Sequence, residues 1–301
     1  MVTEAPDCGL GGRRTKVTGK ATDAWRLGQR KGTSVGEVAY EVFGEGPSVI
    51  LVHGTPMRSY LWRDIVPALA ERRSVYVYDL LGYGESEKGE GQDVSIAAQA
   101  RLLKELVEVW GLEEPAIAGH DIGGGIVLRA QLLEGVRFSR VAILDAVVLG
   151  PRLSAPRSST WHVREHAEAY EAMPNHLFGA FFSAYLGETN SNLGREAFEA
   201  YLEPWRGEEG RRAFVRQALQ VEEWHTGEIE PRLASVEVPV LVVWGEKDGW
   251  LDPSLAPRLR KEIPGSELKL IHEGGHFVQE DAPEEIAKVL AGFFSGDGKR
   301  A

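Results

Sequence analysis

The chain has 301 residues, enough to bury one large core, and its single cysteine, Cys8, excludes an internal disulfide bond. Hydrophobic residues make up 43% and charged residues 26% of the sequence, an ordinary composition for a globular protein. The net charge of −11 argues against a nucleic-acid or membrane partner, and no run approaches the roughly 20 apolar residues of a membrane span. We therefore expect a cytoplasmic protein, of unknown oligomeric state.

The first 23 residues lack a hydrophobic period and are predicted to form a loose N-terminal extension. After this extension, short apolar runs alternate with amphipathic stretches and with turns rich in glycine and proline. Strands are predicted at residues 25–30, 38–43, 48–52, 75–78, 116–118, 141–144, 238–244 and 268–271. Helices are predicted at residues 58–72 and 95–110, and starting at 126 and 283. Alternation of this kind predicts a doubly wound, mostly parallel α/β sheet of eight strands.

The pattern changes between residues 150 and 232, where apolar strand runs are missing and aromatic residues are scattered through helical stretches. We interpret 150–232 as a helical cap, inserted into a core made of residues 24–149 and 233–301. In doubly wound sheets, ligands bind at the carboxyl ends of the strands. The cap is therefore expected to cover a site at that edge.

One turn stands between an apolar strand and an apolar helix, and it reads Gly119-His120-Asp121-Ile122-Gly123. Small residues two positions on either side of a reactive residue are typical of the nucleophile elbow, in which the central residue is usually serine. Here Asp121 has that position. The alternative is that Asp121 only caps the following helix, since aspartate is a favoured N-cap residue.

Further polar residues follow other predicted strands, and parallel topology would bring them to the same edge. Asp248 and His276 follow the last two strands, and Thr55 lies in the His53-to-Pro56 turn after the strand at 48–52. Asp145 also follows a strand, and it is the alternative to Asp248 as the acidic partner of a histidine.

These motifs, in this order, resemble the α/β-hydrolase superfamily over about residues 36 to 295. An aspartate at the elbow resembles the haloalkane dehalogenase and epoxide hydrolase branch. The amino-acid sequence of three segments is similar to that of the dehalogenases: residues 53–63, 79–84 and 276–281. The His-Gly-x-Pro turn is shared with epoxide hydrolases.

The resemblance implies that Asp121 is the nucleophile, His276 the base and Asp248 the acid, with an oxyanion hole formed by the backbone N–H groups of Thr55 and Ile122. Two positions depart from the dehalogenase pattern. Dehalogenases commonly have tryptophan at position 122 and often asparagine at position 55, and both side chains hold the leaving halide. The isoleucine found here cannot donate a hydrogen bond, whereas the threonine hydroxyl can.

A carboxylate is already charged at neutral pH, and its attack on saturated carbon gives an ordinary ester. Asp121 therefore favours displacement at saturated carbon, followed by hydrolysis of the enzyme ester. We expect a small apolar organic substrate, with water as the second substrate. Two hypotheses are haloalkane dehalogenation and epoxide hydrolysis, and a third is a non-catalytic ligand-binding relative.

Cap aromatics could line the pocket or assist the leaving group. The candidates are Trp161, Tyr170, Tyr185, Tyr201, Trp205 and Trp224. The histidines lack the spacing of a metal site, and no cofactor is implied.

Overall fold

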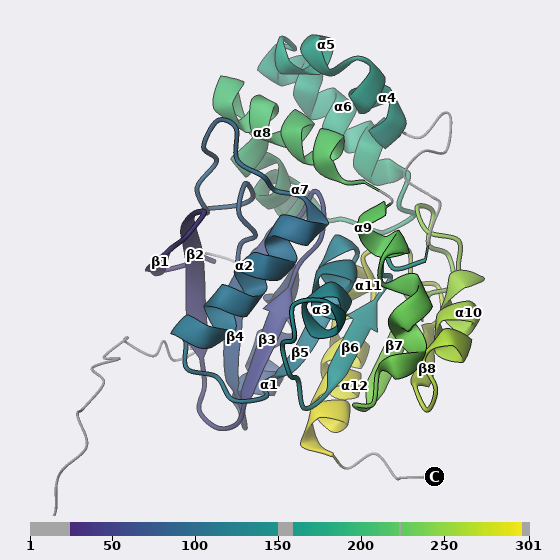
Figure 1. Ribbon diagram of the computed structural model, residues 1–301. Helices are drawn as coiled ribbons and strands as arrows, with labels where there is room; N and C mark the ends of the chain where they lie inside the picture. The colour runs from purple at the N-terminus through teal and green to yellow at the C-terminus, as the bar shows by residue number, and fades with distance from the viewer. Residues whose placement is uncertain (1–24, 150–158, 223, 297–301) are drawn as a thin grey trace, which may run out of the picture.

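The computed structural model describes residues 25–149, 159–222 and 224–296. Its centre is one eight-stranded sheet (Figure 1). The strands are β1 (Gln29–Thr33), β2 (Gly36–Phe43), β3 (Ser48–Val52), β4 (Ser74–Tyr78), β5 (Ala116–His120), β6 (Val141–Leu144), β7 (Val240–Gly245) and β8 (Glu267–Ile271).

The strands lie side by side in the order β1-β2-β4-β3-β5-β6-β7-β8. The two pairs that involve β2 are antiparallel, and the five remaining pairs are parallel. The predicted eight-stranded, mostly parallel sheet is therefore confirmed. Because β4 and β5 lie on opposite sides of β3, the strand order reverses there, and a crevice for ligands opens at such a reversal. The predicted extension at 1–23 lies outside the described residues.

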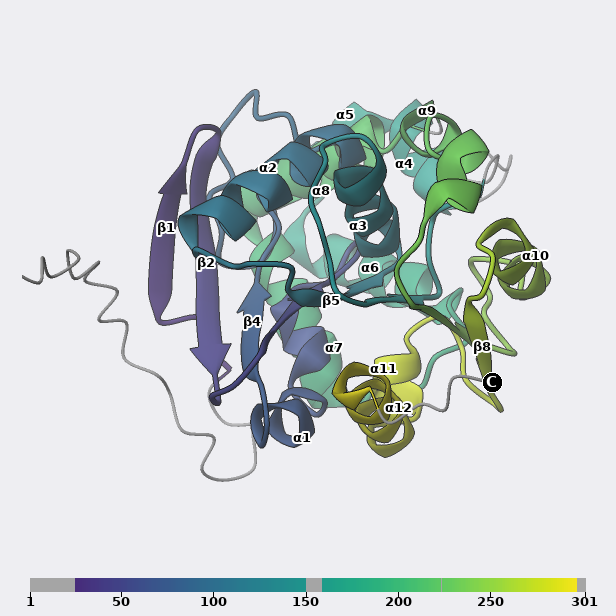
Figure 2. The same cartoon turned by 60° about the horizontal axis from the view of Figure 1, so that its bottom comes forward.

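Helices cover both faces of the sheet (Figure 2). One face packs against α2 (Ile96–Val109) and α3 (Ile122–Leu132), and the other against α1 (Val66–Ala70) and α12 (Pro283–Ser295). Side chains along each buried strand alternate between the two layers; in β3, Ile50 and Val52 join the first cluster and Val49 and Leu51 the second. A further helix, α10 (Leu255–Glu262), packs within the first cluster beside β7 and β8.

A second group of helices lies beyond the carboxyl ends of the parallel strands (Figure 1). Its members are α4 (Ser159–Glu165), α5 (Ala167–Glu171), α6 (Asn175–Gly187), α7 (Arg195–Leu202) and α8 (Gly207–Gln220). Aromatic rings from α6 and α8, including Phe178, Phe182 and Phe214, pack together between these helices. The short helices α9 (Trp224–Gly227) and η3 (Glu230–Ser235) lead back to β7. The exact limits of the cap, 150 and 232, remain a prediction.

Three predicted elements differ from the structure. The helix predicted to start at 126 begins at Ile122, as α3. The helix predicted at 58–72 is split into η1 (Ser59–Trp62) and α1, because Pro67 has no N–H for the preceding turn and starts a new helix. The first strand begins at Gln29 instead of 25. Trp25 packs its ring on Phe43 at 5.5 Å and donates from its indole N–H to Ser59 Oγ at 3.1 Å. Trp25 and Leu27 therefore belong to a docked segment that precedes the first strand.

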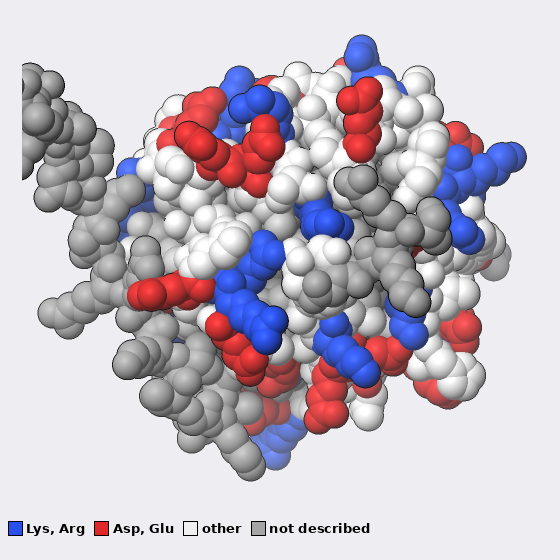
Figure 3. Space-filling view, turned by 90° about the horizontal axis from the view of Figure 1, so that it is seen from below, with Lys and Arg blue, Asp and Glu red and all other residues white. Residues whose placement is uncertain are grey.

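The remaining short helix, α11 (Val278–Asp281), precedes α12, and η2 (Glu203–Trp205) joins α7 to α8. On the face of the molecule away from the cap helices, acidic and basic side chains are interspersed (Figure 3). Within the three described ranges, every helix is too short or too polar to cross a membrane.

Candidate active site

Asp121 lies on the sharp turn between β5 and α3, as the elbow motif predicts. Its backbone has φ 52° and ψ −123°, a region that residues with a side chain rarely adopt. The turn also brings backbones very close together, since a Cβ atom at Gly123 would lie 2.6 Å from the carbonyl oxygen of His53. Asp121 has the N-cap position of α3, but its side chain makes no capping hydrogen bond. Helix capping therefore does not account for this aspartate.

The carboxylate of Asp121 is instead held by two backbone N–H groups. Thr55 N–H donates to Oδ2 at 2.8 Å, and Ile122 N–H donates to the same carboxylate. The two residues predicted to form the oxyanion hole are thus the ones that contact Asp121. Burial raises the pKa of Asp121 to about 6, against the opposing effects of His276 and the two N–H groups. The carboxylate is therefore charged at neutral pH but poorly solvated.

His276 follows β8 and lies between two carboxylates. Its Nδ1 is 2.9 Å from Asp248 Oδ2, and its Nε2 is 3.7 Å from Asp121 Oδ1. The Asp248 carboxylate can only accept, so Nδ1 carries the proton and Nε2 presents its lone pair toward Asp121. The other oxygen of Asp248 accepts the backbone N–H groups of Trp250 at 2.8 Å and Leu251 at 2.9 Å. Asp248 is thereby fixed in position to orient the imidazole.

The pKa of His276 reflects two opposing effects. Complete burial lowers it, and the nearby carboxylates of Asp248 and Asp121 raise it by more, so the pKa lies above its usual value. The distance of 3.7 Å to Asp121 is too long for a direct hydrogen bond. In the part of the chain that the structure describes, Nε2 has no hydrogen-bond partner.

Two rings support the imidazole. Trp250 packs on His276 with ring centroids 5.0 Å apart, and it also contacts Tyr185 of α6 at 4.9 Å. His120, at the end of β5, donates from Nε2 to the carbonyl oxygen of His276 at 2.9 Å. Burial, with His276 beside it, keeps the pKa of His120 well below the usual value, so this ring is neutral.

Asp145, the alternative acid, lies at the end of β6 and is completely buried. Its Oδ1 accepts the backbone N–H of Gly245 at 2.7 Å, and its Oδ2 has no partner among the described residues. Burial and the charge of Asp248 raise the pKa of Asp145 well above its usual value. The hydrogen bond to the imidazole comes from Asp248, not from Asp145.

Three of the cap candidates use their polar atoms elsewhere. The Trp205 indole N–H donates to the carbonyl oxygen of Pro56 at 2.9 Å, and the Tyr170 hydroxyl is 2.7 Å from His162 Nδ1. The Tyr201 hydroxyl donates to Glu280, which also pairs with Arg63. These three side chains are therefore placed to build the cap and its junction with the core, and we do not assign them to the leaving group.

Tyr185 is the cap candidate closest to the reacting groups by its contacts. It is buried, and burial together with the Asp121 charge raises the pKa of its hydroxyl, which lies 3.1 Å from Thr160 Oγ1. Trp161 is half-buried in α4. Trp224 starts α9, and its side chain lies outside the described residues.

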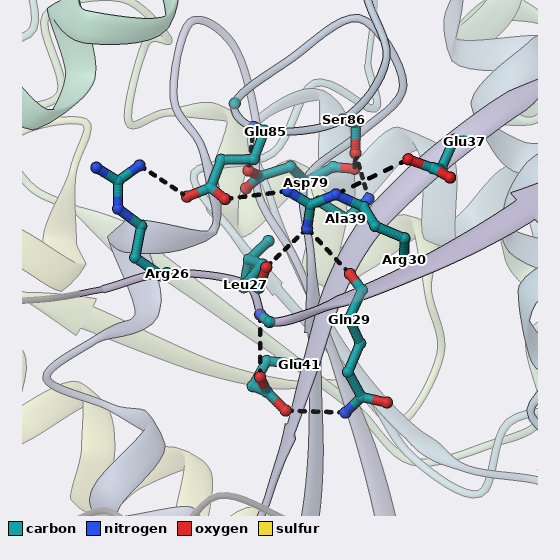
Figure 4. Close-up of polar contacts among 12 residues, drawn as sticks. Arg26, Leu27, Gln29, Arg30, Glu37, Ala39, Glu41, Asp79, Glu85 and Ser86 are labelled. Carbon is teal, nitrogen blue, oxygen red and sulfur yellow. Dashed lines mark hydrogen bonds and ion pairs between the residues drawn. The ribbon is translucent and has the colours of Figure 1, made fainter. Parts of the chain in front are cut away.

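Tyr83, Gln217 and Trp250 were not predicted as site residues. Tyr83 stands in the loop after β4, where the Asp79 carboxylate accepts the Glu85 N–H at 2.6 Å (Figure 4). Gln217 had a detectable signal, because it is the one polar residue in the apolar stripe of α8 that runs through Phe214 and Ala218. No comparable sequence signal marks Trp250.

The described ranges contain no group of three or more His, Cys, Asp and Glu side chains arranged to hold a metal ion.

Comparisons with known proteins bear on the family and the fold of the chain. Residues 47–283 match the family model of the alpha/beta hydrolase fold. Haloalkane dehalogenase 2 of Mycobacterium tuberculosis is 29% identical over 272 residues, which cover 86% of this chain and 91% of that protein. The crystal structure of an alpha/beta hydrolase fold protein from Burkholderia ambifaria is 36% identical, with a TM-score of 0.84, and the match covers 88% of this chain and 97% of that one.

A haloalkane dehalogenase loop variant from Bradyrhizobium elkanii has a TM-score of 0.74 at 23% identity, covering 89% of this chain and 96% of that one, which is a likeness of fold. The resemblance found in the sequence is thus confirmed at the level of the superfamily. The chain belongs to the alpha/beta hydrolase fold family.

Proposed function

We propose that this hydrolase uses Asp121 to displace a leaving group from saturated carbon, and that its substrate is a small haloalkane. The observation that carries the proposal is the arrangement of Asp121, His276 and Asp248 on one edge of the sheet, with 3.7 Å between the imidazole Nε2 and Asp121 Oδ1. A carboxylate in the elbow needs no base to become nucleophilic, so the imidazole is available for a later step.

In the first step, Asp121 Oδ1 attacks the carbon that bears the halogen. A carbon–oxygen bond forms, the carbon–halogen bond breaks, and the halogen leaves with the electron pair as halide. Oδ2 stays on the N–H of Thr55, and the N–H of Ile122 also donates to the carboxylate, so the two groups orient it. The low solvation of the buried carboxylate, expressed in its pKa of about 6, favours this attack.

In the second step, a water between His276 and the ester attacks the Asp121 carbonyl carbon while Nε2 takes its proton. The negative charge that develops on the carboxyl oxygen of Asp121 is stabilised by the N–H groups of Thr55 and Ile122, each worth about 3–4 kcal/mol in comparable sites. Asp248 stabilises the imidazolium that forms. Because the ester has removed the Asp121 charge, one cause of the raised pKa of His276 is gone, so the imidazole is more readily neutral and free to accept the proton of the water.

The substrate class is supported by the named dehalogenase relative and by the chemistry of the aspartate. The test is halide release from a series of short chloro-, bromo- and iodoalkanes, with alcohol measured as the second product. We expect stoichiometric halide and alcohol from the wild-type protein, and neither from Asp121→Asn. If no member of the series gives halide, the haloalkane assignment is wrong.

A second candidate, epoxide hydrolysis, is favoured by one observation. Burial and the charge of Asp121 raise the pKa of both Tyr83 and Tyr185, so two phenol groups lie within electrostatic reach of the carboxylate. Phenols of this kind could donate to an epoxide oxygen as the ring opens. Diol formation from small epoxides, without halide release from the haloalkanes, would select this candidate. Tight ligand binding without any product would instead indicate a binding protein.

A further inference from the structure

A cluster of three polar side chains joins the cap to the core beside Asp121. Gln217, on cap helix α8, is only 1% exposed. Its Oε1 accepts a hydrogen bond from the Tyr83 hydroxyl at 3.3 Å and a shorter one from the Thr55 hydroxyl. Its Nε2 has no acceptor in the described part of the chain. A buried amide N–H₂ without a partner costs about 1–3 kcal/mol, so an acceptor from outside the chain is expected there.

Counting the hydrogen bonds of the cluster shows that a donor is left free for either orientation of the amide. The two hydroxyls and the amide carry four donor hydrogens in total. With Oε1 as described, it accepts both hydroxyl hydrogens and leaves the two amide hydrogens free. With the amide turned over, its hydrogens go to the two hydroxyl oxygens; because Thr55 and Tyr83 also hydrogen-bond each other, one hydroxyl hydrogen stays within the cluster and one is free. At least one donor therefore remains for a ligand in both cases, and two remain in the orientation described.

The position of the cluster links these donors to the reacting carboxylate. The backbone N–H of Thr55 is 2.8 Å from Asp121 Oδ2, so its hydroxyl belongs to a residue in contact with the nucleophile. Tyr83 is held between the rings of His53 at 5.5 Å and Trp205 at 5.6 Å. Its loop is fixed in turn by Asp79 and Ser86, which bond to each other and to the neighbouring strand (Figure 4).

We propose that Thr55, Tyr83 and Gln217 form the site that holds the leaving atom as it gains negative charge. The inference rests on the proposed function and deepens it. Ile122 offers no side-chain donor at the elbow, and the Trp205 indole N–H is bonded to Pro56. Donors aimed at the leaving atom must therefore come from another part of the site, and this cluster has two free ones.

In the step itself, the carbon–halogen bond breaks as the bond to Asp121 Oδ1 forms, and the halide takes the electron pair. The cluster donates two hydrogen bonds to the halide and transfers no proton. For an epoxide the same donors would face the ring oxygen. In both substrates the leaving atom becomes an anion. Halide with alcohol as products would indicate a haloalkane, and a diol would indicate an epoxide.

The test compares Gln217→Leu and Gln217→Glu with the matched control Gln220→Leu on the same helix. Gln220 has both ends of its amide satisfied, accepting from Val94 N–H at 2.6 Å and donating to the Gln92 carbonyl at 3.1 Å. Gln217→Glu keeps the shape and the acceptor but removes the amide donors. The measurement is the single-turnover rate of ester formation with chloro- and iodoalkanes of the same chain length.

We expect both Gln217 variants to slow chloride displacement by about 10- to 100-fold, as for loss of a hydrogen bond to a charged group. Iodide displacement should slow less, because the larger anion spreads its charge and depends less on donors. The control should leave the chloride-to-iodide rate ratio at the wild-type value. A purely structural role would lower both rates equally. An unchanged ratio in both Gln217 variants, with normal melting temperatures, would overturn the proposal.

A second experiment measures halide binding and does not require that the protein turns over haloalkanes. Bromide is titrated against the wild-type protein and Gln217→Leu, which removes the donors without adding a charge, with tryptophan fluorescence as the signal, because Trp250 and Trp205 lie close to the site. Weakened bromide binding in the variant supports the leaving-atom site even if no haloalkane is turned over, and slower diol formation from an epoxide would support it for oxygen. If wild-type protein and variant bind bromide equally or not at all, and no turnover rate depends on Gln217, the cluster does not hold the leaving atom.

Discussion

Replacing Asp121 by asparagine should stabilise the protein while abolishing its activity. The Asp121 side chain is buried, and burial raises its pKa from the usual 3.8 to about 6. A carboxyl group whose pKa is raised on folding contributes stability below its unfolded pKa, and that stability is lost as the pH rises through the folded pKa. The asparagine amide has the same shape and carries no charge, so the variant avoids this loss.

The magnitude follows from the pKa difference of about two units, each worth about 1.4 kcal/mol. Asp121→Asn should therefore unfold with a free energy about 3 kcal/mol higher than the wild type at pH 8, and about 1.5 kcal/mol higher at pH 5. For a chain of this size, about 3 kcal/mol corresponds to a rise of about 5 °C in melting temperature.

The assay is urea unfolding of both proteins across this pH range, followed by tryptophan fluorescence. Asp252→Asn is the matched control, since the same change there affects an exposed aspartate. The gain should grow with pH and level off above about pH 6 to 7. If Asp121→Asn is less stable than the wild type, or if its gain does not depend on pH, the carboxylate is not held in a desolvated, reactive state.

Three further results are expected. The value of kcat/KM should fall as the pH drops through about 6, because protonated Asp121 is no nucleophile; an acid limb more than one pH unit away would contradict this assignment. Gly54→Ala should abolish ester formation and lower stability, because its Cβ would lie 2.6 Å from Asp121 Oδ2 and 2.7 Å from the His120 carbonyl oxygen, and retained burst kinetics would refute it. Asp248→Asn should slow ester hydrolysis by about 10⁴-fold, since an amide can hold the wrong imidazole tautomer. Pre-steady-state kinetics of this variant separate ester formation from ester hydrolysis.

Much of the fold followed from the sequence because two signals agreed along most of the chain. Wholly apolar runs such as 48–52 and 141–144 become buried central strands with the predicted limits. Ser95 caps α2 with its side chain, and Pro283 starts α12, as these residue types predict. The errors came where tertiary contacts override local pattern, as in the docking of Trp25 on Phe43 and the helix break near Pro67.

The site was predictable to the extent that it follows strand ends. Asp121, Asp248 and His276 come together because β5, β7 and β8 are parallel and end at the same edge. The contribution of the cap was not predictable in this way, because nothing in its sequence fixes how its helices sit on the core. Trp205 and Tyr201 therefore appeared as pocket candidates, although their polar atoms bond elsewhere, while Gln217 of α8 was not considered.

The most direct test of the covalent mechanism is the intact mass of His276→Ala after incubation with a bromoalkane. Without the imidazole, ester formation should proceed and ester hydrolysis should stall. The account predicts a stable mass increase equal to one alkyl group in place of a hydrogen, mapped by peptide sequencing to Asp121, with one equivalent of bromide released. Bromide release without any adduct, or an adduct on another residue, would contradict the assignment of Asp121 as the nucleophile.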